Sequence, residues 1–247
     1  MLDGTPLEGA VQGYRGRVTA PVVLVHGWGG SFETTWQRSG FTELLRDAGR
    51  DVHGIDLLGH GSAPKPHDPE AYADLGEGVL AALPDEPVDA LGFSLGAITL
   101  LRLASEHPHR FRHLVLAGIG KNVVDPDPAD ADSGERIAAA VEGNAPDSDT
   151  HAHVFAQYAH QPGNDPVALA AIMRRPRSPF TAEQLAAVTC PVLVVIGDKD
   201  FAGPGEPLAA ALPNATLKVL RNVDHFATPE AFGLWDAVLD FFDAPMP

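Results

Sequence analysis

Ser94 lies between two glycines in the pattern Gly92-Phe93-Ser94-Leu95-Gly96. An apolar run over residues 88–93 comes directly before it, and a helical apolar pattern begins at Leu95. A sharp turn from strand to helix exposes the serine hydroxyl and crowds the backbone two residues to either side, which only glycine tolerates. Since a serine hydroxyl is a weak nucleophile, it also needs a base and donors for the developing oxyanion. The pattern predicts a nucleophilic serine at position 94.

Two later segments offer a candidate base and a candidate acid. Asp224-His225-Phe226 follows the apolar run 216–220, and Gly197-Asp198-Lys199-Asp200 follows the run 192–196. A histidine can take the serine proton, and a carboxylate can hold the imidazole in the required tautomer. The pattern predicts His225 as the base and leaves Asp198 and Asp200 as alternatives for the acid. The order serine, acid, histidine differs from that of the chymotrypsin and subtilisin folds.

A glycine-rich segment follows the first clear apolar run. It has the sequence His26-Gly27-Trp28-Gly29-Gly30, and the run before it covers residues 22–25. Glycines let the chain fold back so that a backbone N–H can face a reacting carbonyl. We expect the amides of Trp28 and Leu95 to form an oxyanion hole, and the Trp28 side chain to border the pocket.

The elements that must position these groups alternate between strand and helix. Apolar runs of this length suit parallel strands that are covered on both faces, and they lie at residues 22–25, 52–55, 88–93, 114–117, 192–196 and 216–220. Helical patterns lie between or after them at residues 41–48, 95–106, 204–212 and 229–242. The alternation predicts an α/β fold with a doubly wound, mostly parallel sheet, whose ligand crevice lies at the carboxyl ends of the strands. Residues 7–17 are a weak candidate for an additional N-terminal strand or hairpin.

The alternation stops between about residues 121 and 180. Helical patterns cover 135–141, 150–160 and 167–174, with Asp165-Pro166 as a helix start and Thr181 with Gln184 as a capping box. We expect residues 1–120 and 181–247 to form the core and 121–180 to form a helical cap over the sheet edge. The candidate pocket residues are apolar, although helix packing explains them equally well: Trp28, Phe155, Tyr158, Met173 and Phe226.

Charge and cysteine content restrict the partners. The formal net charge is −16, from 33 acidic and 17 basic side chains. Such a surface repels phosphate backbones and anionic lipid, so we expect a small-molecule substrate, no nucleic acid and no membrane. The sequence shows no secretory signal at its start and a single cysteine, Cys190, and a cytoplasmic location is expected. The oligomeric state is left open.

Histidines and arginines outside these segments suggest further sites. His151, His153 and His160 cluster in one predicted helix, but side chains two positions apart point to different faces. We therefore expect no metal site and no cofactor. The basic run containing Arg174, Arg175 and Arg177 is interpreted as a solvated face, with recognition of a substrate carboxylate as the alternative.

Together these segments resemble the α/β-hydrolase superfamily, in particular its capped small serine hydrolases and esterases. The resemblance also includes Asp56-Leu-Leu-Gly-His-Gly61, in which His60 belongs to a structural turn. In that family the acid is usually the last residue of a G-x-x-D segment, which implies Asp200, with Asp198 as a turn former. Ala97 stands where relatives often have a second glycine.

The resemblance implies hydrolysis of a carboxylic ester through an acyl-enzyme by Ser94, Asp200 and His225. A serine at this position disfavours the haloalkane dehalogenases and epoxide hydrolases of similar architecture, which use an aspartate. The alternatives are a carbon–carbon bond hydrolase or lyase, and a receptor-like protein that binds a small molecule and retains the triad.

Overall fold

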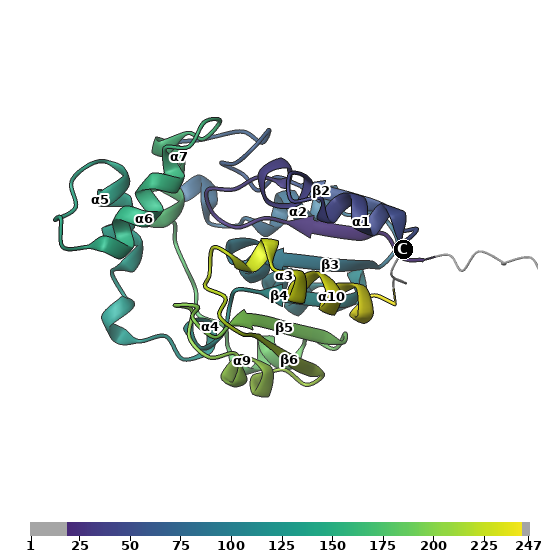
Figure 1. Ribbon diagram of the computed structural model, residues 1–247. Helices are drawn as coiled ribbons and strands as arrows, with labels where there is room; N and C mark the ends of the chain where they lie inside the picture. The colour runs from purple at the N-terminus through teal and green to yellow at the C-terminus, as the bar shows by residue number, and fades with distance from the viewer. Residues whose placement is uncertain (1–18, 244–247) are drawn as a thin grey trace, which may run out of the picture.

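Six parallel strands form a single sheet at the centre of the molecule (Figure 1). The computed structural model describes residues 19–243. The strand order is β2-β1-β3-β4-β5-β6, with the strands at β1 Val22–Val25, β2 Val52–Ile55, β3 Val88–Phe93, β4 Phe111–Ala117, β5 Val192–Gly197 and β6 Ala215–Leu220. The chain reverses its direction of strand addition between β1 and β3, and ligand crevices of open parallel sheets form at such points.

The α/β prediction with a mostly parallel sheet is confirmed, and each predicted apolar run lies within one of the strands. β1, β3 and β5 are buried along their whole length, because helices cover both faces of the sheet. β6 differs, since it is an edge strand and several of its side chains are exposed. Residues 7–17, the weak candidate for an additional strand, lie outside the described residues.

Helices cover the two faces of the sheet and divide the core in two. Val22 and Leu24 face the layer of α1 and α10, whereas Val23 and Val25 face the layer of α2, α3, α8 and α9, as expected from the period of two along a strand. These helices are α1 Phe41–Asp47, α2 Gly76–Ala82, α3 Leu95–Glu106, α8 Ala182–Ala186, α9 Glu206–Ala211 and α10 Phe232–Phe241.

Further helices occupy the chain between β4 and β5. They are α4 Lys121–Val124, α5 Ser133–Val141, α6 Thr150–Ala159 and α7 Pro166–Arg174. Asp165 caps α7 by accepting from the amides of Val167 and Ala168, and Thr181 with Gln184 forms a capping box at α8. Figure 1 shows α5, α6 and α7 together beyond one end of the sheet. We refer to α5, α6 and α7 as the cap; its extent over 121–180 stays a proposal.

Several elements differ from the sequence-based expectation, among them α4, which was not predicted. The helix expected over 229–242 is divided, because Ala231 is extended between the short turn Thr228–Glu230 and α10. The glycine-containing helix α2 and the π-helical turn Glu33–Gln37 were not predicted. Their sequences lack a long apolar period, so contact with the core rather than local propensity decides their conformation. The remaining 3-10 turns are Pro69–Tyr72, Pro108–Arg110 and Pro128–Asp130.

A buried charge network lies at the amino ends of the strands. Arg50 is paired with Asp89, and both side chains are almost completely buried. Arg50 also donates to the carbonyl oxygens of Phe242 and Ala20, each at 2.7 Å. His113 Nδ1 lies 3.0 Å from the other oxygen of Asp89. The network connects the end of α10 to the sheet, far along β3 from Ser94.

Candidate active site

Ser94 occupies a strained turn between β3 and α3. Its backbone has φ 50° and ψ −110°, an uncommon conformation for a residue with a side chain. A Cβ on Gly92 would lie 2.6 Å from the amide nitrogen of Ala97, and one on Gly96 would lie 2.4 Å from the carbonyl oxygen of His26. The two glycines are therefore required by close backbone approach, and the resulting turn presents the hydroxyl at the sheet edge.

The structure brings Ser94, His225 and Asp200 together. His225 Nε2 lies 3.0 Å from Ser94 Oγ, and His225 Nδ1 lies 2.9 and 3.0 Å from the two carboxylate oxygens of Asp200. A carboxylate beside Nδ1 favours the tautomer in which Nδ1 carries the proton, which leaves Nε2 free to accept from the hydroxyl. His225 is only 4% exposed and Asp200 9%, so the contact is shielded from water.

Asp198 has a different environment from Asp200. Its Oδ1 accepts a hydrogen bond from the amide of Asn222 at 2.7 Å, whereas His225 Nδ1 is hydrogen-bonded to Asp200. Asn222 has a positive φ of 59°, so this bond supports a tight turn after β6. Of the two acids left open by the residue pattern, Asp200 is the one beside His225.

The amides of Trp28 and Leu95 lie in the two loops that meet at Ser94. Trp28 is in a turn closed by a hydrogen bond from the amide of Gly30 to the carbonyl oxygen of Gly27 at 3.2 Å. Leu95 is the first residue of α3, where amides have no partner within the helix and point toward the helix N-terminus. The assignment of these amides to an oxyanion hole stays a proposal.

His26 connects the loop after β1 to the loop after β2. Its Nδ1 donates to the carbonyl oxygen of Gly27 at 2.7 Å, and its Nε2 accepts from the amide of Leu57 at 3.1 Å. Burial lowers the pKa of His26, and burial together with the charge of His26 lowers the pKa of His60 to about 3. Neutral imidazoles thus brace the turn that carries the Trp28 amide, which agrees with a structural role for His60.

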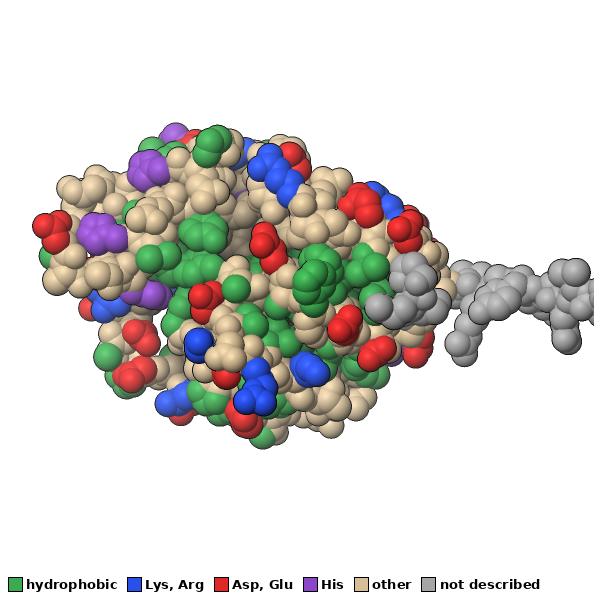
Figure 2. Space-filling model, in the orientation of Figure 1, with side chains coloured by type: hydrophobic (Ala, Val, Ile, Leu, Met, Phe, Trp, Pro, Cys, Tyr) green, Lys and Arg blue, Asp and Glu red, His purple; other side chains and the backbone are tan. Residues whose placement is uncertain are grey.

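A cavity of about 210 Å³ opens above Ser94 between the core and the cap. Its lining comprises Gly27, Trp28, Gly29, Gly30, Thr34, Thr35, Phe93, Ser94, Phe155, Tyr158, Gln161, His225, Phe226, Pro229 and Glu230. Figure 2 shows hydrophobic side chains gathered where the cap meets the core. The volume suits a small substrate.

Four of the five proposed pocket residues line this cavity, namely Trp28, Phe155, Tyr158 and Phe226. Met173 does not. It lies beside a second cavity, next to α5, and packs against the core. The sequence placed Met173 on an apolar helix but did not determine which face of α7 meets the cavity.

Aromatic rings connect the cap to His225. Tyr158 stacks on Phe226 with ring centroids 4.8 Å apart, and Trp28 lies 5.4 Å from Phe155. Phe201 contacts the ring of His225 with centroids 4.2 Å apart. Phe201 was missed in the sequence, although its position directly after Asp200 places it beside the imidazole.

The polar lining residues Thr34, Thr35, Gln161 and Glu230 were also missed. Thr34 and Thr35 belong to the unpredicted π-helical turn, and Gln161 follows the end of α6. No motif marks these positions. Their roles follow from how loops distant in the sequence approach one another.

Other candidate groups have structural contacts. His153 and His160 lie within hydrogen-bond distance of the carbonyl oxygens of Pro146 and Val141. Within residues 19–243, no group of three or more His, Cys, Asp or Glu side chains is placed to hold a metal ion. Arg174 is paired with Glu135 and Glu142. In the same range no helix combines the length and the apolar character needed to cross a membrane.

The fold and the serine–histidine–aspartate arrangement together define a class of hydrolase. The chain belongs to the α/β-hydrolase fold family, whose model matches residues 20–147. It is 31% identical to the pimeloyl-[acyl-carrier protein] methyl ester esterase of Neisseria meningitidis, over 83% of this chain and 70% of that protein.

Two further comparisons cover different parts of the chain. A shorter match to the 2-hydroxymuconate semialdehyde hydrolase of a Pseudomonas strain has 38% identity, over 40% of this chain and 36% of that protein. Among solved structures, a hydrolase from Pseudomonas aeruginosa has a TM-score of 0.66 and 28% identity, and the match covers 92% of this chain and 91% of that one.

Proposed function

We propose that this protein is a serine esterase that cleaves the carboxylic ester of a small molecule through an acyl-enzyme. The observation that carries the proposal is the position of His225 Nε2, 3.0 Å from Ser94 Oγ, with Asp200 at the opposite ring nitrogen. The matches to methyl ester esterases support an ester as the substrate.

In the first half of the reaction, His225 Nε2 takes the proton of Ser94 as Oγ attacks the carbonyl carbon. Asp200 stabilises the imidazolium that forms. The carbonyl π electrons move to oxygen, and the amides of Trp28 and Leu95 donate to that oxyanion; one such donor typically contributes about 2.7–4 kcal/mol. Collapse of the intermediate breaks the bond to the alcohol oxygen, which leaves with the proton from His225.

In the second half, water replaces the alcohol. His225 takes a proton from the water, whose oxygen attacks the acyl carbon, and Ser94 leaves with the proton returned by His225. The acid product departs and the enzyme regains its initial state. Burial of His225 and Asp200 keeps bulk water away from their contact, while the cavity beside Ser94 provides space for the attacking water.

Labelling with a fluorophosphonate, followed by mass spectrometry, tests the nucleophile. We expect the label on Ser94 and its loss in S94A. Ser105 provides a matched control, because it lies on the same helix and its hydroxyl donates to the carbonyl oxygen of Arg102. S105A should label as wild type does. Labelling of a different serine, or unchanged labelling of S94A, would refute the assignment.

A carbon–carbon bond hydrolase is the second candidate, favoured by the match to 2-hydroxymuconate semialdehyde hydrolase. It would use the same residues on a vinylogous diketone. Steady-state turnover of p-nitrophenyl acetate is compared with turnover of such a diketone, and the faster reaction identifies the activity. A single slow turnover on both substrates would instead favour a receptor-like binding protein.

A further inference from the structure

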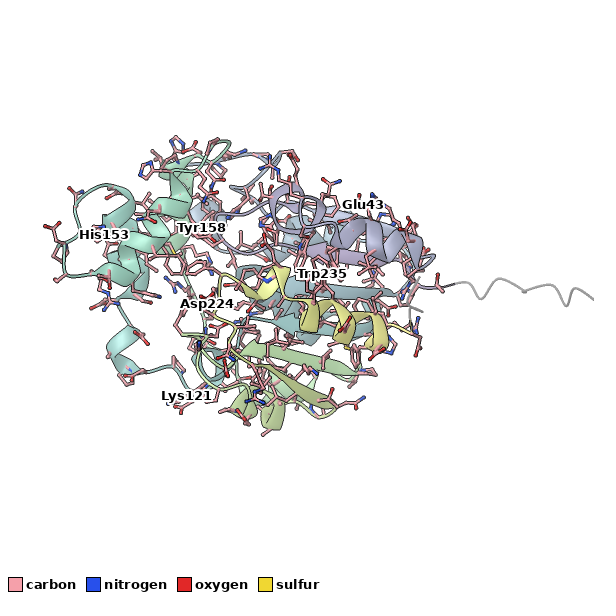
Figure 3. The ribbon with its side chains drawn as sticks, viewed as in Figure 1. Glu43, Lys121, His153, Tyr158, Asp224 and Trp235 are labelled. Carbon is pink, nitrogen blue, oxygen red and sulfur yellow. The ribbon has the colours of Figure 1, made fainter. Side chains whose placement is uncertain are left out.

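The cavity above Ser94 has an acidic rim. Among the described residues that line the cavity, Glu230 is the one with a charged side chain of the Lys, Arg, Asp or Glu type. Glu230 is exposed and follows the loop that carries His225. Burial raises the pKa of Tyr158, and the charges of Glu230 and Asp224 raise it further. Of these two carboxylates, Glu230 lines the cavity. Figure 3 labels Tyr158 on the cap and Asp224 on the core.

Aromatic side chains form much of the same wall. Trp28, Phe155, Tyr158 and Phe226 line the cavity, and the pairs Trp28–Phe155 and Tyr158–Phe226 are in ring contact. The face of an aromatic ring carries partial negative charge and attracts cations, most strongly where water is excluded. A lining that combines aromatic side chains with a carboxylate suits an ammonium group.

The charge of the whole chain acts in the same direction. Its formal net charge is −16, which attracts cations toward the surface and repels anionic substrates. A cationic substrate therefore gains from long-range attraction as well as from the cavity wall.

The loop after β6 indicates which part of the ester would carry the cation. His225 must protonate the leaving alcohol, so the alcohol lies beside this residue. Phe226 and Glu230 come from the same loop and line the same cavity. The alcohol is thus directed toward the acidic, aromatic part of the wall.

We propose that the preferred substrates are short esters whose alcohol part bears a positively charged ammonium group, held between the aromatic side chains of the cavity and the Glu230 carboxylate. The proposal rests on the proposed esterase function and specifies its substrate class.

Acetylcholine and 3,3-dimethylbutyl acetate provide a matched pair of probes, because they differ only in a charged nitrogen and a neutral carbon. The readout is kcat/KM for acetylcholine divided by kcat/KM for 3,3-dimethylbutyl acetate. Comparing this ratio between variants cancels the intrinsic reactivity of the two esters. We expect E230Q to lower the ratio about threefold and E230K to lower it about tenfold, in the range of a partly desolvated charge and cation–π contact.

Glu43 supplies the control. It is an exposed carboxylate on α1, well separated from the cavity (Figure 3), and E43Q changes the net charge by the same amount as E230Q. E43Q should keep the wild-type ratio. High salt, about 0.5 M sodium chloride, should reduce the difference between wild type and E230K, because exposed charges are screened.

Binding of tetramethylammonium, measured by calorimetry on the whole protein, tests the site without turnover. We expect wild type and E43Q to bind it and E230K to bind it more weakly. Absence of binding overturns the proposal, and so does a ratio that is equal in wild type, E230Q and E230K. Cation binding by a protein in which fluorophosphonate does not label Ser94 would refute the esterase function while leaving the cation site in place.

Discussion

The indole Nε1 of Trp28 donates a hydrogen bond to the carbonyl oxygen of Leu169, at 3.1 Å. Trp28 belongs to the loop after β1, whose amide we assign to the oxyanion hole, and Leu169 is a buried residue of the cap helix α7. One side chain therefore connects the cap to the loop that is expected to stabilise charge during the reaction.

Removing this hydrogen bond should loosen the cap. In W28F an aromatic ring is kept but the donor is lost, which is worth about 1 kcal/mol. We expect kcat/KM for p-nitrophenyl acetate to fall about fivefold, and hydrogen exchange to accelerate in α7 but not in α3. Unchanged exchange in α7 would mean that other contacts hold the cap.

The two acids after β5 should differ sharply. D200N removes the carboxylate beside His225 and favours the wrong tautomer, so we expect kcat to fall about 10⁴-fold. D198N weakens only the turn at Asn222 and should alter kcat less than about threefold. Steady-state kinetics on p-nitrophenyl acetate compare them. A larger defect in D198N would reverse the assignment of the acid.

Gly96 and Gly78 form a matched pair for stability. A Cβ at Gly96 would lie 2.4 Å from the carbonyl oxygen of His26, whereas nothing lies within 4 Å of a Cβ at Gly78 in α2. We expect G96A to lower the free energy of unfolding by about 1–3 kcal/mol or more, and G78A to raise it by up to about 1 kcal/mol. Urea denaturation measures both. Equal stability of the two variants would contradict the required close approach at Gly96.

The buried imidazole of His60 should make stability depend on pH. Burial and the charge of His26 lower its pKa from 6.5 to about 3. Between these values the unfolded chain binds a proton that the folded chain does not, so the folded state loses stability as the pH falls. The contribution is about 1.4 kcal/mol per pH unit. H60Q should show a shallower decline between pH 6.5 and 4.5, monitored by urea denaturation.

A surface histidine controls for the loss of an imidazole. His109 is exposed in the turn Pro108–Arg110, and H109Q should retain the steep decline. The prediction is contradicted if H60Q and H109Q follow the same curve. The pKa of His26 is also lowered by burial, so part of the decline should persist in H60Q.

Local sequence was sufficient where a backbone constraint forces a residue type. Gly92 and Gly96 are required by contacts closer than a side chain permits, so the turn at Ser94 could be located from spacing alone. The buried strand β3 was located to the residue, because a strand covered on both faces has a continuous apolar sequence.

The sequence was not sufficient to predict which residues line the cavity, because packing between segments distant in the sequence determines that. Phe155 and Met173 are both apolar residues of cap helices, yet only Phe155 lines the cavity. Glu230 is an ordinary exposed carboxylate in sequence terms and becomes part of the cavity only because its loop approaches α6. Such contacts have no local pattern, because helix orientation in the cap is determined by tertiary contact.

The paired charges of Arg50 and Asp89 lie at the end of β3 opposite to Ser94. A substitution in that pair would therefore change the free energy of unfolding without altering the residues that line the cavity beside Ser94. Conversely, the loops beside Ser94 can vary in sequence while the distant Arg50–Asp89 pair keeps the sheet and α10 together. Stability and substrate selectivity can consequently be changed independently, because the residues that determine them lie at opposite ends of β3.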